Sequence, residues 1–180
     1  MTQEQKRALV TGASSGIGRE FATQLAAKGY AVTVVARRED RLRELIATLP
    51  GTGHSVLAAD LSSPQGLDAL LDLIRSERTH LLVNNAGYSV LEPFYQSELS
   101  KQQNILDVNC RAVVTLAHAF LQQAQQGDAL INVASIVSFL PTPAQPMYSA
   151  SKAFLAAFSE CLWTEQKERG VYVMGLCPGV

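Results

Sequence analysis

Short apolar runs alternate with longer stretches along this chain. The short runs are mostly β-branched or aliphatic and are too short for helices, so we predict that they are strands. In the longer stretches, apolar residues recur every three or four positions, which is the spacing of an amphipathic helix. The predicted strands span residues 8–11, 31–36, 55–59, 81–84, 129–133 and 171–176, and the predicted helices span residues 16–28, 38–49, 65–76, 100–126 and 148–168.

This alternation predicts an α/β fold with a doubly wound parallel sheet, because parallel strands need helical crossovers between them. We expect a Rossmann-like sheet of six strands in the order 3-2-1-4-5-6, with helices on both faces and every strand buried on both faces. Gly29, Gly170 and the pair Pro50-Gly51 stand where helices should end. Ligands of such sheets bind at the carboxyl ends of the strands, so the residues after each strand are the first candidates for a site.

The composition fits one globular domain over residues 1–180. A chain of 180 residues can bury one substantial core, and 47% hydrophobic and 17% charged residues are ordinary for a globular protein. Fifteen lysines and arginines against sixteen aspartates and glutamates give a formal net charge of -1. This balance argues against nucleic acid or an anionic membrane as a partner, because the molecule has no global field that attracts them.

The cysteines and the first residues of the chain bear on metal binding and on the cellular location of the protein. Cys110, Cys161 and Cys177 are widely spaced, which argues against a disulfide framework and against a zinc site, so we expect no metal. A reducing, cytoplasmic location fits this cysteine usage. The first residues are polar, and no apolar run approaches the roughly eighteen residues of a membrane span, so we expect neither a signal peptide nor a membrane span.

A glycine-rich turn follows the first predicted strand, in the segment Thr11-Gly12-Ala13-Ser14-Ser15-Gly16-Ile17-Gly18. Its glycines allow the backbone to turn tightly and to approach a pyrophosphate, which would then lie at the N-terminus of the next helix. The spacing G-x-x-x-G-x-G differs from the better-known G-x-G-x-x-G, but its place between a strand and a helix supports the same use. We expect cofactor contacts from Gly12, Ser14, Ser15, Gly16, Ile17 and Gly18.

The residue after the second strand indicates which dinucleotide binds. In nucleotide-binding units of this kind, a carboxylate at this place selects the free 2′-hydroxyl of NAD. Here the residue is Arg37, whose planar cation suits a 2′-phosphate, with Ser14 and Arg38 as further donors. The sequence therefore favours NADP(H) over NAD(H). The alternative is that Arg37 merely opens a charged helix.

Five separately placed motifs together cover essentially the whole chain. They are the turn at residues 11–18, Asp60-Leu61 after the third strand, Asn84-Asn85-Ala86-Gly87 after the fourth, Ser135 after the fifth, and Tyr148-Ser149-Ala150-Ser151-Lys152; Pro178-Gly179 after the sixth strand agrees as well. In this combination they resemble the motifs of the short-chain dehydrogenase/reductase family. Taken singly, these residues would be an ordinary turn, a strand-end cap or a helix face. Because all of them occur together and in this order along the chain, we interpret them as parts of a functional site.

The resemblance implies roles for individual positions. Asp60 and Leu61 would flank the adenine, and Asn85, Ala86 and Gly87 would pass behind the cofactor, with Pro178 and Gly179 adding to the cofactor-binding set. The implied catalytic tetrad is Asn109, Ser135, Tyr148 and Lys152, in which Asn109 would help to hold a water for proton relay. Lys152 would also hold the nicotinamide ribose.

The spacing of Tyr148 and Lys152 suits proton transfer to a carbonyl. Four residues apart on one helix, the two side chains share a face. A free tyrosine has a pKa of about 10, and a nearby cation favours its phenolate form, which allows a tyrosine to act as acid and as base. We expect Lys152 to supply that cation and Ser135 to hydrogen-bond the substrate oxygen.

Two departures from the family pattern matter for the substrate. Ser138 stands where many relatives carry glycine, which predicts an extra hydroxyl close to the substrate pocket. Family members normally continue beyond the equivalent of Pro178-Gly179 through a substrate lid, another helix and a seventh strand. Because the sequence of 180 residues stops at Val180, we expect that it does not include this C-terminal segment.

The sequence predicts an oxidoreductase that transfers a hydride between NADP(H) and a carbonyl or secondary alcohol. The alternative is a dinucleotide-binding regulator or scaffold without catalysis. A homodimer or homotetramer is expected, because the helices at residues 100–126 and 148–168 carry more apolar surface than one sheet face covers, and the resemblance implies the same. The identity of the substrate and the direction of the reaction stay open.

Overall fold

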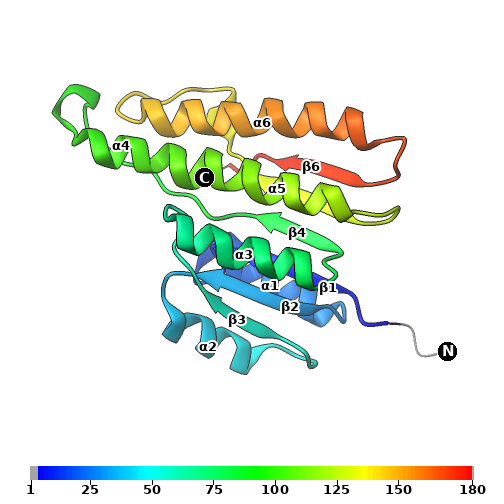
Figure 1. Cartoon of the computed structure of the whole chain (residues 1–180). Coiled ribbons are helices and arrows are strands. Elements are labelled where there is room, and N and C mark those ends of the chain that lie inside the picture. The colour runs from blue at the N-terminus through cyan, green and yellow to red at the C-terminus, as the bar shows by residue number, and fades with distance from the viewer. Residues whose placement is uncertain (1–3, 180) are drawn as a thin grey trace.

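The computed structural model describes residues 4–179 of the chain. These residues fold around one parallel sheet. The strand order is β3-β2-β1-β4-β5-β6, and every neighbouring pair is parallel, so the predicted order is confirmed (Figure 1). The strands are β1 (Arg7–Thr11), β2 (Ala31–Ala36), β3 (Ser55–Ala58), β4 (Leu81–Asn84), β5 (Ala129–Val133) and β6 (Tyr172–Leu176). Since all strands run in one direction, the loops after them meet at one edge of the sheet.

Helices cover both faces of the sheet. One face packs against α1 (Gly16–Ala27) and α2 (Glu39–Thr48), through a core that includes Val10, Leu25 and Leu45. The opposite face packs against α3 (Pro64–Ser76), α5 (Ala112–Gln123) and α6 (Pro146–Gln166), through a core that includes Leu70 and Phe120. Two short 3₁₀ helices, η1 (Phe94–Gln96) and η3 (Ile136–Ser138), lie in the loops after β4 and β5.

The single helix predicted for residues 100–126 is wrong in one respect. The chain forms α4 (Leu99–Leu106), then a π-helical turn, η2 (Asp107–Arg111), and then α5, as one continuous rod in Figure 1. A π turn accommodates one more residue than an α turn and often marks a functional site. Here the wider turn contains Asn109, whose side chain is fully buried.

The prediction that every strand is buried on both faces holds for the interior of the sheet but is wrong for its edges. All residues of β4 are buried, whereas Ser55 and Ala58 of β3 and Tyr172 and Gly175 of β6 are exposed. The reason is topological, because β3 and β6 each have only one neighbouring strand among the described residues. Edge strands are less completely covered by the flanking helices.

The start of α6 agrees with the expected effect of proline. Gln145 has φ -134° and ψ 46°, outside the helical region, and the helix begins at Pro146, so that Tyr148 lies in its first turn. The cysteines at positions 110, 161 and 177 are free thiols. Over residues 4–179, no helix is both long enough and apolar enough to cross a bilayer.

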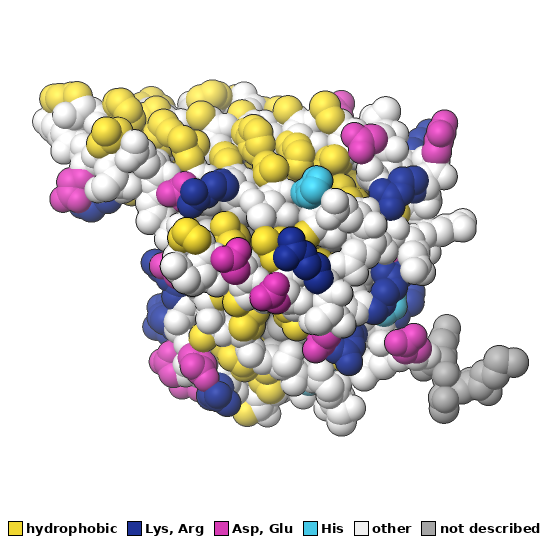
Figure 2. Space-filling view, viewed as in Figure 1, with side chains coloured by type: hydrophobic (Ala, Val, Ile, Leu, Met, Phe, Trp, Pro, Cys, Tyr) yellow, Lys and Arg dark blue, Asp and Glu magenta, His cyan; other side chains and the backbone are white. Residues whose placement is uncertain are grey.

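Apolar side chains remain exposed on the three helices α4, α5 and α6. Figure 2 shows apolar side chains in a nearly continuous band across the upper part of the molecule, whereas in the lower part of this view they are interspersed with charged side chains. Exposed large apolar residues on these helices are Leu99, Leu106, Val114, Phe154 and Trp163.

Candidate functional site

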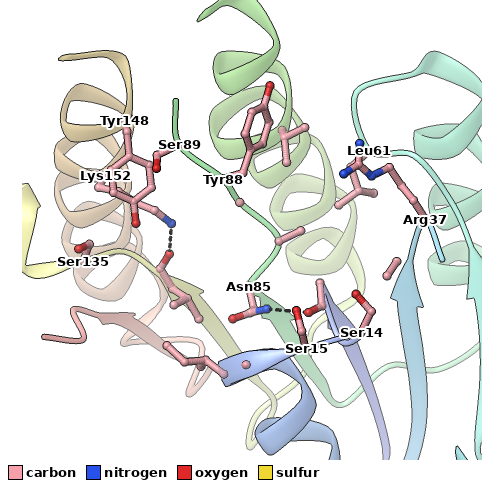
Figure 3. Close-up of a pocket in the computed structure, with 18 of the residues that line it drawn as sticks. Ser14, Ser15, Arg37, Leu61, Asn85, Tyr88, Ser89, Ser135, Tyr148 and Lys152 are labelled. Atoms are coloured by element: carbon pink, nitrogen blue, oxygen red, sulfur yellow. Dashed lines mark hydrogen bonds between the residues drawn. The ribbon is translucent and has the colours of Figure 1, made fainter. Parts of the chain in front are cut away.

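A pocket of about 620 Å³ opens at the carboxyl edge of the sheet. Its lining comes from the loops after the strands and from the first turns of α1 and α6 (Figure 3). The sequence-predicted residues that line it are Gly12, Ser14, Ser15, Gly16, Ile17, Arg37, Arg38, Asp60, Leu61, Asn85, Ala86, Gly87, Ser135, Tyr148, Lys152, Pro178 and Gly179. Two further candidates, Gly18 and Asn109, are buried beside the pocket and do not form its surface.

The glycine-rich turn fits a closely approaching ligand. Gly12 has φ +67°, and a Cβ there would lie 2.8 Å from the Cα of Ala86. A Cβ on Gly18 would lie 2.5 Å from the carbonyl oxygen of Gly12, so Gly18 lets α1 pack directly under the turn. The N-terminus of α1 therefore faces the pocket with its unpaired backbone N–H groups, which is an arrangement that binds anions.

Thr11 joins the turn to the loop after β4. Its buried Oγ1 accepts hydrogen bonds from the backbone N–H groups of Asn85 (3.0 Å) and Ala86 (3.1 Å). The Nδ2 of Asn85 donates in return to the carbonyl oxygens of Thr11 (3.0 Å) and Gly12 (3.2 Å). Thr11 opens the glycine motif but is not among the cofactor contacts that the sequence predicts; its hydroxyl fixes the two loops that a dinucleotide would touch.

One end of the pocket is basic. Arg38 donates from Nη2 to the Oγ of Ser14 at 3.3 Å, which places two of the three expected phosphate donors next to each other. Arg37 is exposed and lines the same end, and Figure 3 shows it across the pocket from Tyr148 and Lys152. The positive charges and the hydroxyl there are the groups that a phosphate monoester needs.

Asp60 lines the pocket, but part of its carboxylate is committed to the protein. Its Oδ1 accepts from the backbone N–H (2.9 Å) and the hydroxyl (2.8 Å) of Ser62. The backbone N–H of Ser62 is the main cause that lowers the pKa of Asp60, the Ser62 hydroxyl and the charge of Arg37 add to it, and partial burial opposes it. Asp60 is thus ionised and caps the loop before α3 as well as facing the pocket.

Tyr148 and Lys152 stand at the other end of the pocket. The Nζ of Lys152 lies 5.6 Å from the centre of the Tyr148 ring and donates to the carbonyl oxygen of Val133 at 2.7 Å. Lys152 is only 4% exposed, and this burial lowers its pKa from the ordinary 10.5 to about 8. Ser135 lines the same end, where its Oγ accepts from the backbone N–H of Val137 at 3.3 Å and retains its own proton for another acceptor.

Asn109 lies behind the end of the pocket that Tyr148 and Lys152 line, and does not line the pocket itself. Its Oδ1 accepts from the backbone N–H of Tyr88 at 3.2 Å, and its Nδ2 donates to the carbonyl oxygen of Tyr88 and to the Oγ of Ser151, both at 3.1 Å. Both N–H bonds and the oxygen of the amide are thus engaged, and the residue has no exposed surface. The side chain of Asn109 therefore positions other groups and does not itself face the pocket.

Ser138 does not contribute the extra pocket hydroxyl that the sequence predicted. Its Oγ donates to the carbonyl oxygen of Lys152 at 2.8 Å, and the residue lies outside the lining of the pocket. Serine hydroxyls commonly donate to backbone carbonyls in this way, and this bond turns the Ser138 hydroxyl toward α6. In the loop after β4, residues Tyr88 and Ser89 line the pocket.

Because burial lowers the pKa of Lys152, the free energy of unfolding should depend on pH. Between pH 8 and 10.5 the unfolded chain binds more protons at this lysine than the folded chain does, so the folded state gains stability as the pH rises through this window. Lys152→Met removes the titration. At about 1.4 kcal/mol per pKa unit, the free energy of unfolding of the wild type should rise by about 3 kcal/mol relative to Lys152→Met between pH 7 and pH 10.5.

Urea unfolding of both proteins across this pH range measures the difference. Lys101→Met, a change at an exposed lysine, serves as the control for the loss of one surface charge. A constant difference between wild type and Lys152→Met over the whole range would contradict the burial of a charged Lys152.

Comparison with known proteins shows what this chain is similar to. Residues 6–180 match the sequence profile described as short chain dehydrogenase. The chain is 36% identical over 177 residues to the very-long-chain 3-oxoacyl-CoA reductase of Neurospora crassa, which covers 92% of this chain and 53% of that protein. It is 32% identical over 181 residues to an uncharacterized oxidoreductase of Staphylococcus epidermidis, which covers 98% of this chain and 78% of that protein. The chain thus spans about half the length of the curated 3-oxoacyl-CoA reductases it matches.

Solved structures agree with the sequence comparison. A short-chain dehydrogenase from Sphingobium yanoikuyae in complex with NADPH has a TM-score of 0.92 and 33% identity, with 97% of this chain and 71% of that chain covered. The bulky-bulky ketone specific alcohol dehydrogenase from Comamonas testosteroni has a TM-score of 0.90 and 29% identity, with 98% and 74% covered. Since the family profile extends over almost the entire sequence and the same fold recurs in these dehydrogenases, the chain belongs to the short-chain dehydrogenase family.

Proposed function

We propose that this chain is an NADP(H)-dependent oxidoreductase that transfers a hydride between the nicotinamide and a carbonyl or secondary alcohol. One observation carries the proposal: Tyr148, Lys152 and Ser135 meet at one end of a pocket whose other end is formed by the glycine-rich turn and two arginines. The carbonyl chemistry and the dinucleotide-binding features thus share one cavity, as hydride transfer requires.

The residues of the pocket fit a dinucleotide phosphate. Gly12 and Gly18 leave no room for side chains, so the backbone of the turn and the N-terminus of α1 can hold a pyrophosphate. Arg37, Arg38 and Ser14 would bind the 2′-phosphate, and Asp60 and Leu61 would border the adenine. NADPH bound in this way would supply the hydride, and the similarity to an NADPH-bound short-chain dehydrogenase supports the choice of cofactor.

The mechanism assigns one proton step to the protein. In reduction, the hydroxyl of Tyr148 donates its proton to the carbonyl oxygen of the substrate as negative charge develops there, and Ser135 donates a hydrogen bond to the same oxygen. The ammonium of Lys152, fixed by Val133, stabilises the phenolate that is left. In oxidation the phenolate accepts the proton again. Asn109 supports these groups through the hydrogen bonds of its side chain.

We further propose that the substrate is a bulky, apolar carbonyl compound. Leu91, Phe94, Phe139 and Leu140 are large apolar residues that are at least half exposed, on the loops after β4 and β5. A hydrogen bond from the backbone N–H of Glu92 to the carbonyl oxygen of Ala144 joins these two loops at 3.2 Å. The similar proteins that act on very-long-chain 3-oxoacyl-CoA and on bulky ketones support this class.

Turnover by the wild-type chain tests the proposal. The chain is mixed with NADPH or NADH and with three carbonyls: a bulky aryl ketone, a 3-oxoacyl thioester and a short, charged keto acid. We expect the loss of NADPH absorbance with the first two substrates and a preference for NADPH over NADH. Tight NADPH binding without turnover of any carbonyl would instead favour a non-catalytic dinucleotide-binding protein, and failure to bind NADPH would contradict both.

The proposed function includes a homo-oligomeric assembly and a cytoplasmic location. The exposed apolar residues on α4, α5 and α6 support a homodimer or homotetramer, since monomers rarely leave such large apolar patches uncovered (Figure 2). The free thiols fit a reducing, cytoplasmic setting. Light scattering that detects only the monomer at micromolar concentration would contradict the oligomer.

A further inference from the structure

The geometry points to Ser151 as a positioning residue for the reaction: its hydroxyl fixes the helical turn that carries Tyr148 and Lys152 to the loop behind the cofactor. This inference rests on the proposed function, because it concerns how the proton donor is held. Ser151 lies between the two catalytic candidates in the sequence and is only 1% exposed, so it does not touch a ligand itself.

The hydroxyl of Ser151 joins two elements. It donates to the carbonyl oxygen of Tyr148 at 2.7 Å, within α6, and it accepts from the Nδ2 of Asn109 at 3.1 Å, across to the π turn. Both capacities of the hydroxyl are thus in use in a site without water access. A side-chain link of this kind orients the helical turn in a way that the backbone hydrogen bonds of α6 alone do not.

The connection continues to the wall of the pocket. Asn109 holds both the N–H and the carbonyl of Tyr88, and Tyr88 lines the pocket directly after Gly87. A Cβ on Gly87 would lie 3.2 Å from the Oδ1 of Asn109 and 3.3 Å from the Nζ of Lys152. The loop, the π turn and α6 therefore meet within van der Waals distance at this point, and Ser151 supplies the hydrogen bond that ties α6 to the other two.

Without this hydroxyl, one N–H of Asn109 has no partner and the first turn of α6 loses its link to the loop. A displacement of a reacting group by about 1 Å can cost about 100-fold in rate. For a partial loosening we expect Ser151→Ala to lower kcat by about ten-fold and to leave the KM for NADPH within about two-fold, because the cofactor contacts are kept. Because the turn that carries Tyr148 and Lys152 is then no longer fixed, the pH profile of kcat/KM should differ from that of the wild type.

Ser159 offers a closely matched control on the same helix. It is also 1% exposed, its Oγ accepts from the Nδ2 of Asn132 at 3.0 Å, and it donates to the carbonyl oxygen of Leu155 at 2.6 Å. The chemistry is the same as at Ser151, but Ser159 lies outside the lining of the cofactor pocket. Ser159→Ala should therefore destabilise the fold to a similar degree and leave kcat and the pH profile as in the wild type.

The experiment measures kcat, KM and pH profiles, with NADPH and the best ketone, for the wild type, Ser151→Ala, Ser159→Ala and Ser151→Thr. Ser151→Thr keeps the hydroxyl and should recover most of kcat. If Ser151→Ala does not fold, Ser151→Cys replaces it, since a thiol has a similar size and is a weak donor. Equal kcat values and pH profiles for the Ser151 and Ser159 variants would overturn the inference.

Amide hydrogen exchange decides the same question without turnover. Loss of the Ser151 hydroxyl should raise exchange in residues 85–90 and 105–112 as well as in the first turns of α6, whereas Ser159→Ala should leave the first two segments unchanged. No change in those segments for Ser151→Ala would contradict the link. If the wild type itself reduces no carbonyl, the proposed function fails while exchange still decides whether Ser151 joins these elements.

Discussion

Replacing Tyr148 with phenylalanine is expected to lower kcat by about 1,000-fold, which lies within the range for losing a general acid. The change removes the only proton that the mechanism sends to the substrate oxygen and keeps the aromatic ring beside Lys152. Because the ring and the cofactor contacts stay, the Kd for NADPH should change by no more than about two-fold.

Stopped-flow absorbance measures kcat, and quenching of protein fluorescence by NADPH measures Kd. Tyr95→Phe, at a tyrosine that is 84% exposed, is the control for loss of a tyrosine hydroxyl. Turnover by Tyr148→Phe at the wild-type rate would rule out Tyr148 as the proton donor. A parallel loss of NADPH binding would mean that the hydroxyl serves the cofactor instead.

Replacing Arg37 with aspartate is expected to reverse the cofactor preference. The change removes a cation from the end of the pocket that Arg38 and Ser14 share, and it puts a carboxylate where it can accept from a free ribose hydroxyl and repel a phosphate. Each hydrogen bond between charged groups contributes about 1.5 to 3 kcal/mol. With one lost and repulsion added, the ratio of the Kd values for NADPH and NADH should shift by about 1,000-fold toward NADH.

Titration of the variant with both cofactors, at one fixed ionic strength, measures this ratio. Arg41→Asp carries the same change of charge on the exposed surface of α2 and should leave the ratio almost unchanged. If Arg37→Asp and Arg41→Asp gave the same ratio, Arg37 would be only the opening residue of a charged helix.

The strand order and the location of the site could be predicted from the sequence. Parallel strands bring the residues after each strand to one edge, so Gly12, Arg37, Asn85 and Ser135 had to lie along the same edge of the sheet. The shared helix face of Tyr148 and Lys152 followed from their spacing. The sequence pattern was therefore sufficient wherever backbone periodicity determines the direction of a side chain.

The pattern was insufficient where side-chain hydrogen bonds decide the local structure. The π turn contains Asn109, which bonds to Tyr88 and Ser151 far away in the sequence, and the apolar spacing of residues 100–126 gives no sign of this turn. Ser138 is predicted close to the substrate pocket because it stands where many relatives carry glycine, yet its hydroxyl donates to the backbone carbonyl oxygen of Lys152. Partners of buried hydroxyls and amides are set by packing, which one sequence does not encode in a readable period.

Transfer of deuterium tests the central claim most directly. The wild-type chain is incubated with NADPH that carries deuterium at both positions of C4 of the nicotinamide and with a bulky apolar ketone, and the product is examined by mass spectrometry. The account predicts an alcohol with deuterium on the carbinol carbon, formed by the wild type and almost absent with Tyr148→Phe. No alcohol, or an alcohol without deuterium, would contradict hydride transfer in this pocket.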